Sequence, residues 1–285
     1  MTDQVTISAR AKVNLFLRVL AREADGYHGI ETLFCRIDLA DELTAVRSPA
    51  GVELVVEGAD TGPPEDNLAV RAARMVLEAT GQRFGVRLSL VKRIPVAAGL
   101  GGGSADAAAA LSAVNGLAGN VIPGHELLQF GARLGADVPF CLSGAALALG
   151  WGHGDRLMAL APLPSAPALL VCPQVEVSTA QAYRWVDEQR AGAGQRRAIT
   201  LDREGLGSWS SIARMAGNDF ETPVFGKHPA VRSAFEALVG TGPLLCRMSG
   251  SGAAVFAVYR SARDRDDARD QLGKKHGQVI SSETG

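Results

Sequence analysis

Glycines gathered between a predicted strand and a predicted helix are the strongest chemical signal in this 285-residue chain. They are Gly99, Gly101, Gly102 and Gly103, and Ser104 follows them directly. Because glycine has no Cβ, such a run lets a bulky anion approach the main chain closely. The first turn of the following helix would add unpaired N–H groups and a partial positive charge. The run therefore predicts a binding site for phosphate groups.

The spacing of these glycines differs from that of two common nucleotide-binding motifs. The chain has no Gly-x-x-x-x-Gly-Lys-Ser/Thr sequence here, and Ser104 takes the place of the last glycine in Gly-x-Gly-x-x-Gly. A flexible loop that ends in a helix cap is the alternative interpretation. We favour the phosphate site, because a loose connection does not need four glycines at this point.

A lysine and an aspartate could supply acid–base chemistry beside such an anion. Lys12 and Asn14 alternate on a predicted strand, so their side chains leave the same face about 6–7 Å apart. Asp137 lies among apolar residues, where a carboxylate needs a cationic partner or its pKa rises. A pair with Lys12 would keep Asp137 ionised and help to stabilise a substrate alkoxide. A surface lysine and a capping or turn aspartate are the alternatives.

Tyr27 and His28 follow a turn at Asp25-Gly26. An aromatic ring at a loop tip can stack on a nucleic acid base, and an imidazole can bind the edge of that base. The alternative is an ordinary, partly packed Tyr-His pair.

A second glycine-containing cluster lies between two predicted strands late in the chain. Its members are Ser249, Gly250, Ser251 and Gly252. If the cluster belongs to a second domain, it could close over the same phosphates across a cleft between domains. A hairpin with a bulge is the alternative.

The pattern of apolar residues predicts the elements that position these groups. Strands are expected at 6–19, 32–39, 43–57 in two pieces, 85–93, 145–150, 168–172, 243–248 and 253–259. Helices are expected at 67–80, 104–117, 124–133, 178–189, 229–239 and 262–275. The first strand should have one buried face, the 190–207 segment should be a mobile loop, and the tail from Gly277 should fray. The alternation predicts an α+β fold with mostly antiparallel strands.

Prolines and alanines concentrate at 161–168, and we expect a domain boundary between residues 152 and 167. We expect an N-terminal domain at 1–158, with the glycine run and the Lys12–Asp137 pair, and a C-terminal domain at 159–285.

Composition and charge exclude several classes of protein. The chain has 29 Lys and Arg against 30 Asp and Glu, which argues against binding to nucleic acid by bulk charge. A hydrophobic fraction of 47% indicates a folded chain. The four cysteines form no Cys-x-x-Cys pair, so they signal neither a zinc site nor a disulfide framework. We see no signal peptide and no membrane-spanning run, and we expect a cytoplasmic protein.

The segment Pro95–Ser104 resembles the phosphate-binding motif of the GHMP kinase superfamily. Other segments, in the same order along the chain, narrow the resemblance to the branch that acts on a cytidine diphosphate-linked methylerythritol. They are Ala11–Leu17, Ala24–His28, Glu65–Leu68, Leu134–Pro139, Asn218–Glu221 and Met248–Ala253. Motifs that recur in order are far more specific than any one of them.

This resemblance implies a two-domain α+β GHMP kinase fold with mixed and antiparallel sheets and an active site in the interdomain cleft. It implies phosphorylation by ATP of the 2-hydroxyl of 4-diphosphocytidyl-2-C-methyl-D-erythritol, in the methylerythritol phosphate route to isoprenoids. Magnesium would be held mainly by ATP oxygens and water. The expected state is a monomer or weak homodimer, with no nucleic acid or membrane partner.

The resemblance also implies roles for single residues. Asp137 would be the general base and Lys12 its electrostatic partner. Asn14 would hold phosphate or hydroxyl oxygens of the substrate. Tyr27 would stack on the cytosine, and His28 would bind its edge.

On the nucleotide side, the resemblance places Asn67 at the adenine. The segment that would bind the ATP phosphates consists of Pro95, Gly99, Leu100, Gly101, Gly102, Gly103 and Ser104. The second cluster, Ser249 to Gly252, would contact the substrate. Ala105 departs from members that have a second serine there, which puts one phosphate or metal contact in doubt.

Two other functions stay open at this stage. One is a homoserine or mevalonate-type kinase of the same superfamily. The other is a non-catalytic module that binds RNA or senses a nucleotide. The near-neutral charge and the presence of both Lys12 and Asp137 weigh against the second.

Overall fold

The computed structural model describes residues 3–24, 26–190, 201–202 and 204–285 and forms two compact units. Unit 1 consists of Met1–Lys12, Leu39–Val96 and Gly101–Ala145. Unit 2 consists of Val13–Asp38, Ala97–Leu100 and Ala146–Gly285. The sequence predicts contiguous domains at 1–158 and 159–285. The units differ from that division because two long strands, β1 (Gln4–Arg22) and β2 (His28–Ser48), each contribute to both.

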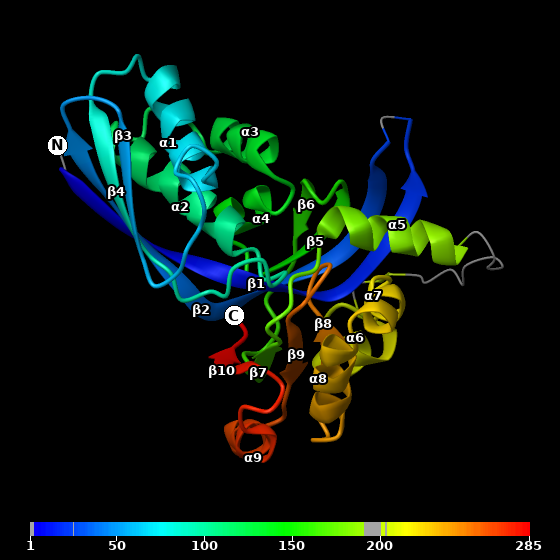
Figure 1. Ribbon diagram of the computed structural model, residues 1–285. Coiled ribbons are helices and arrows are strands. Elements are labelled where there is room, and N and C mark those ends of the chain that lie inside the picture. The colour runs from blue at the N-terminus through cyan, green and yellow to red at the C-terminus, as the bar shows by residue number, and fades with distance from the viewer. Residues whose placement is uncertain (1–2, 25, 191–200, 203) are drawn as a thin grey trace. The chain divides into compact units, whose positions relative to one another are not determined.

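Unit 1 is a sheet with a layer of helices on one side of β3 and β4 (Figure 1). β3 (Val52–Glu57) pairs in parallel with β4 (Gly85–Val91), which pairs antiparallel with the Glu42–Ser48 part of β2. The helices are α1 (Leu68–Ala79), α2 (Gly102–Leu117), α3 (Gly124–Leu134) and α4 (Val138–Ser143). The core joins sheet residues to helix residues: Leu43, Leu88, Leu90, Val76, Leu111 and Val114.

Helix α2 is apolar on nearly all sides and buried along most of its length. A helix of this kind belongs inside a protein rather than on its surface. Its small side chains let α1 and α4 pack closely against it. They are Ala105, Ala107, Ala108, Ala109, Ala110 and Ala113. The alanine-rich sequence thus sets the helix that follows the glycine run at the centre of unit 1.

Unit 2 contains two sets of antiparallel strands. The Ile30–Cys35 part of β2 pairs with β5 (Leu147–Gly152), which pairs with β6 (Arg156–Ala159). A separate four-stranded sheet has the order β10-β7-β9-β8. Its strands are β7 (Pro167–Cys172), β8 (Leu245–Met248), β9 (Val255–Val258) and β10 (Gln278–Glu283).

Five helices of the described chain belong to unit 2. They are α5 (Thr179–Arg190), α6 (Trp209–Met215), α7 (Glu221–Lys227), α8 (Pro229–Val239) and α9 (Ala262–Leu272). Helix α8 packs on β8 and β9, and α9 packs on β7 and β10 (Figure 1). The apolar face of the sheet meets both helices in a second core, with members Leu169, Val171, Val255, Val231, Leu238 and Leu272.

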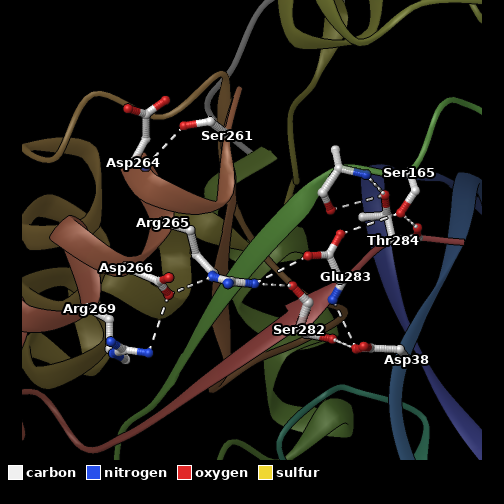
Figure 2. A network of polar contacts seen from close by, with 11 residues as sticks. Asp38, Ser165, Ser261, Asp264, Arg265, Asp266, Arg269, Ser282, Glu283 and Thr284 are labelled. Carbon is white, nitrogen blue, oxygen red and sulfur yellow. Dashed lines mark hydrogen bonds and ion pairs between the residues drawn. The ribbon is translucent and has the colours of Figure 1, made fainter.

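The prediction that the tail frays from Gly277 is wrong. β10 pairs with β7 over its whole length, and polar contacts hold its end in place (Figure 2). The carboxylate of Asp38 accepts hydrogen bonds from Ser282 Oγ at 2.5 Å and from the Glu283 backbone N–H at 2.9 Å. Arg265 forms an ion pair with Glu283 at 3.3 Å. The sequence pattern did not predict this strand, because its residues are mostly polar and its pairing partners lie far away in the sequence.

Other differences from the expected elements concern length and burial. β2 is one continuous strand, where the sequence predicts shorter pieces. The short elements β6, α4, α6 and α7 carry too few residues for a clear period, and the sequence reading missed them. β1 is buried on both faces from residue 11 to residue 17, where one buried face is predicted.

Most of the predicted mobile loop, 190–207, lies outside the described residues. Within the described part of the chain, no helix has both the length and the apolar character that crossing a membrane requires.

A buried amide supports the connection between α2 and α3. Asn115 Nδ2 donates to Ile122 O at 2.9 Å, and Asn115 Oδ1 accepts from Ile122 N at 3.1 Å. We predict that Asn115→Ala lowers the free energy of unfolding by about 2–4 kcal/mol, because it leaves two buried backbone groups unpaired. Urea denaturation measures this. Ser112→Ala on the same helix is the control and should change stability by less than about 0.5 kcal/mol. Equal stabilities for both variants would contradict the role of the amide.

Candidate active site

Lys12 and Asp137 form an ion pair inside unit 1. Lys12 Nζ lies 3.1 Å from Asp137 Oδ2. Lys12 comes from β1, and Asp137 is the residue that precedes α4. The Lys12 side chain is only 4% exposed, whereas the Asp137 side chain is 30% exposed. The pair thus presents a carboxylate that solvent or a ligand can reach, with a buried ammonium behind it.

The glycine run packs directly on the stem of Lys12. Gly101 has φ +71°, in the left-handed region that favours glycine. A Cβ at Gly101 would lie 3.0 Å from both Cγ and Cε of Lys12. Glycine at this position therefore lets the main chain lie against the lysine, and it brings the predicted phosphate site next to the Lys12–Asp137 pair.

Helix α2 begins at Gly102, and its N-cap is Gly101. No side chain of the described residues caps this end of α2, so its first N–H groups have no side-chain acceptor among them. Ser104 lies in the first turn. A Cβ at Gly103 would meet nothing closer than Leu68 Cδ1 at 3.9 Å. These features give an exposed helix N-terminus suited to an anion.

The first part of the glycine run belongs to unit 2, where it contacts the second glycine cluster. Ser249 Oγ donates a hydrogen bond to Gly99 O at 2.8 Å. A Cβ at Gly99, whose φ is +79°, would lie 2.3 Å from Ser249 O. The side chain of Leu100 is buried in the protein, so only its main chain could bind a nucleotide. The two clusters, predicted separately, are therefore in direct contact.

Two buried asparagines hold the second cluster from either side. The Gly250 N–H donates to Asn14 Oδ1 at 3.0 Å, and Asn218 Nδ2 donates to Gly250 O at 2.8 Å. Asn14 Nδ2 also donates to Thr32 Oγ1 at 2.8 Å. Asn14 thus positions the second glycine cluster. The sequence did not predict this role. Its contact with a substrate stays a prediction.

Ser251 and the nucleotide-side residues have ordinary structural partners. Ser251 Oγ lies 2.8 Å from Thr179 Oγ1 at the start of α5. Asn67 is the N-cap of α1, and its Oδ1 accepts from Ala69 N at 2.9 Å. Pro95 lies between β4 and the glycine run, partly buried. The predicted adenine contact of Asn67 is not tested by this arrangement.

Tyr27 and His28 lie in unit 2 and differ sharply in exposure. The Tyr27 residue is 67% exposed, with its ring centroid 5.4 Å from that of His153. His28 is buried; its Nε2 lies 2.7 Å from Asp187 Oδ1, and its ring stacks on Tyr183 at a centroid distance of 5.1 Å. The carboxylate therefore fixes the orientation of the imidazole, while Tyr27 is largely exposed.

The sequence reading missed several residues of these clusters. Asp187 and Tyr183 lie on α5 without a distinguishing pattern, and only the fold brings them to His28. Asn218 stands in a segment that carried the family resemblance, so its motif was a usable signal. Among the described residues, no group of three or more His, Cys, Asp or Glu side chains could hold a metal ion.

Comparison with known proteins gives a consistent result. The model of the GHMP kinases N terminal domain matches residues 67–145, and that of the GHMP kinases C terminal domain matches residues 201–278. The 4-diphosphocytidyl-2-C-methyl-D-erythritol kinase of Solibacter usitatus is 40% identical over 96% of this chain and 87% of its own length. That of Moorella thermoacetica is 42% identical over 99% of both chains.

Solved structures agree with the sequence relatives. A crystal structure of 4-(cytidine 5'-diphospho)-2C-methyl-D-erythritol kinase matches with a TM-score of 0.83 and 36% identity over 99% of each chain. A mevalonate kinase from L. major, in complex with R-mevalonate, has a TM-score of 0.71 and 13% identity, over 99% of this chain and 97% of that chain. The second similarity shows a shared fold.

The contrast between Gly101 and Gly103 yields a prediction about stability. Gly101→Ala should destabilise unit 1 by about 1–2 kcal/mol, because alanine is strained at this φ and would press on Lys12. Gly103→Ala is the matched change at an open helical position. It should leave stability unchanged or raise it by up to about 1 kcal/mol. Thermal and urea denaturation test the pair, and a Gly103→Ala protein less stable than Gly101→Ala would refute the packing described above.

Proposed function

This chain belongs to the 4-diphosphocytidyl-2-C-methyl-D-erythritol kinase family of the GHMP kinases, and from that premise we propose a reaction for its site. The enzyme transfers the terminal phosphoryl group of ATP to the 2-hydroxyl of 4-diphosphocytidyl-2-C-methyl-D-erythritol, within the methylerythritol phosphate route to isoprenoids. The observation that supports this most is the Lys12–Asp137 pair packed against the glycine run.

Asp137 acts as the general base in this proposal. The hydroxyl of the substrate is tertiary and a weak nucleophile, so a carboxylate within hydrogen-bond reach takes its proton as the new P–O bond forms. The bond between the terminal phosphorus and its bridging oxygen breaks, and ADP leaves. Lys12 stabilises the negative charge that develops on the attacking oxygen, because its ammonium lies beside the same carboxylate.

The N-terminus of α2 binds the phosphates of ATP. Phosphoryl transfer depends on positioning and on neutralising charge rather than on covalent chemistry. The uncapped N–H groups and the helix dipole supply part of this neutralisation. Magnesium supplies the rest when it arrives bound to ATP, held mainly by phosphate oxygens and water.

Tyr27 and His28 recognise the cytidine end of the substrate. The exposed Tyr27 ring stacks on the cytosine, and His28 binds the edge of that base with an imidazole that Asp187 holds in place. Asn14 and the second glycine cluster contact the substrate. Asn14 and Asn218 hold that cluster through Gly250, and Ser249 links it to Gly99. We further propose that the enzyme works in the cytoplasm as a monomer or weak homodimer.

An ADP-release assay with the cytidyl substrate tests the reaction. Asp137→Asn should lower kcat by at least about 100-fold, because it removes the base and keeps the volume of the side chain. The Kd for ATP should change little. Asp267→Asn on the exposed face of α9 is the control and should behave as wild type. Near-normal turnover of Asp137→Asn would exclude Asp137 as base, and faster turnover of homoserine or mevalonate would exclude the substrate.

Tyr27→Ala separates the two ligand sites. Loss of one base-stacking ring should raise the KM for the cytidyl substrate by about 5–150-fold, with kcat and the KM for ATP nearly unchanged. Tyr27→Phe keeps the ring and should resemble wild type. If instead only the KM for ATP changed, the assignment of the nucleotide and substrate sites would be reversed.

A further inference from the structure

A lysine shared by two buried aspartates lies beneath the glycine run in unit 1, outside the residues used above. Lys92 Nζ donates to Asp106 Oδ2 at 2.7 Å and also to Asp41 Oδ2. The three side chains are at most 4% exposed. They come from three elements: Asp41 from β2, Lys92 from the residue after β4, and Asp106 from α2. One ammonium therefore faces two carboxylates in the buried interior of the unit.

The two carboxylates have unequal partners. Asp41 Oδ1 accepts hydrogen bonds from the backbone N–H groups of Arg93 and Ile94, the latter at 2.8 Å. Asp106 Oδ1 is buried and has no hydrogen-bond partner within the described structure. A second full negative charge here lacks compensation, so protonation is favoured at Asp106 rather than at Asp41. Burial raises the pKa of Asp106 to about 7, against the opposing effect of Lys92 and with a smaller rise from Asp41.

Among the described residues, Lys92 and Asp41 are the charged groups that shift the pKa of Asp106. The side of α1 that packs on α2 is apolar, since Arg71, Arg74 and Glu78 are exposed. On α3, the charged side chains are exposed as well. α4 carries no charge of its own, and Asp137 before it is paired with Lys12. The protonation of Asp106 thus depends on Lys92, Asp41 and whatever binds at the start of α2.

The cluster adjoins the proposed phosphate site. Asp106 lies one helical turn inside the start of α2. A Cβ at Gly102 would lie 3.3 Å from Lys92 Nζ and 3.0 Å from Ile94 Cγ2, so the lysine lies directly against the main chain of the glycine run. Phosphates bound at these N–H groups would bring negative charge close to the Asp106 carboxyl group, whose own negative charge is only partly balanced by Lys92.

We propose that Asp106 is a positioning residue of the nucleotide site: it anchors the first turn of α2 through Lys92 and takes up a proton when the phosphates of a nucleotide bind. The inference rests on the proposed function, because it needs a nucleotide at the glycine run. Below its pKa, Asp106 is protonated before binding, and affinity does not depend on it. Above that pKa, the proton must be acquired on binding, so nucleotide affinity falls as the pH rises, by up to about tenfold per pH unit.

Calorimetric titration with magnesium–ADP tests this coupling. The observed binding enthalpy, measured at pH 7.5 in buffers of different ionisation enthalpy, gives the number of protons taken up. Wild type should take up more protons than Asp106→Asn, and the Kd of wild type should rise more steeply between pH 7 and 8.5. Titration of ADP itself is common to both proteins and cancels in the difference. Glu126→Gln, an equal charge change at an exposed position on α3, is the control and should match wild type.

The outcomes separate the possible failures. Equal proton uptake and parallel pH profiles for wild type and Asp106→Asn, with ADP bound by both, would overturn this inference and leave the proposed kinase intact. A wild type that binds no ADP would refute the proposed function, and the inference with it.

Should Asp106→Asn fail to fold, carboxyl-carbon NMR of aspartate-labelled wild type answers the same question. One aspartate should titrate near pH 7, and its midpoint should move upward when ADP is added. Absence of such an aspartate, or a midpoint that ADP leaves in place, would overturn the proposal.

Discussion

The contact between the main chain at Gly101 and the side chain of Lys12 is the constraint on which the rest of unit 1 depends. It exists because no Cβ occupies the space that the lysine stem fills. The same contact sets the start of α2 beside the ammonium, and the ammonium in turn lies beside Asp137. The start of α2, where the sequence predicts an anion site, and the carboxylate are therefore held in one geometry by packing.

Within each unit, buried polar side chains fix the local structure in a similar way. Asn14 and Asn218 satisfy both backbone groups of Gly250, and Ser249 links that loop to Gly99. Burying these polar groups carries little free-energy penalty while every hydrogen bond is made. Breaking one bond leaves a buried group unpaired, which raises the free energy, so the bonds specify one loop conformation. The Lys92 cluster does the same for the first turn of α2, except that one oxygen of Asp106 has no hydrogen-bond partner among the described residues. The unpaired oxygen is what distinguishes Asp106, which we propose changes its protonation, from the asparagines, whose hydrogen bonds only support the fold.

Much of the fold was predictable from local pattern. The helices α1, α2, α3 and α8 lie within two residues of their expected limits, because apolar periodicity and glycine stops are local signals. Elements stabilised by distant partners were not predictable. β10 has a polar sequence and exists because β7 and Asp38 pair with it, and the burial of both faces of β1 follows from packing against other elements.

For the site, the amino-acid sequence alone determined the chemistry on offer: a glycine run before a helix, a lysine and an aspartate, an aromatic residue with a histidine, and motifs whose order identified the family. Only the tertiary structure decided which of these groups meet. Lys12 and Asp137 are 125 positions apart, and the 3.1 Å between them is a property of packing. It likewise decided that Asp187 holds His28 and that Asp106 shares Lys92 with Asp41. Residue type fixes what a group can do, whereas burial and neighbours, which no local pattern encodes, set its charge and its partner.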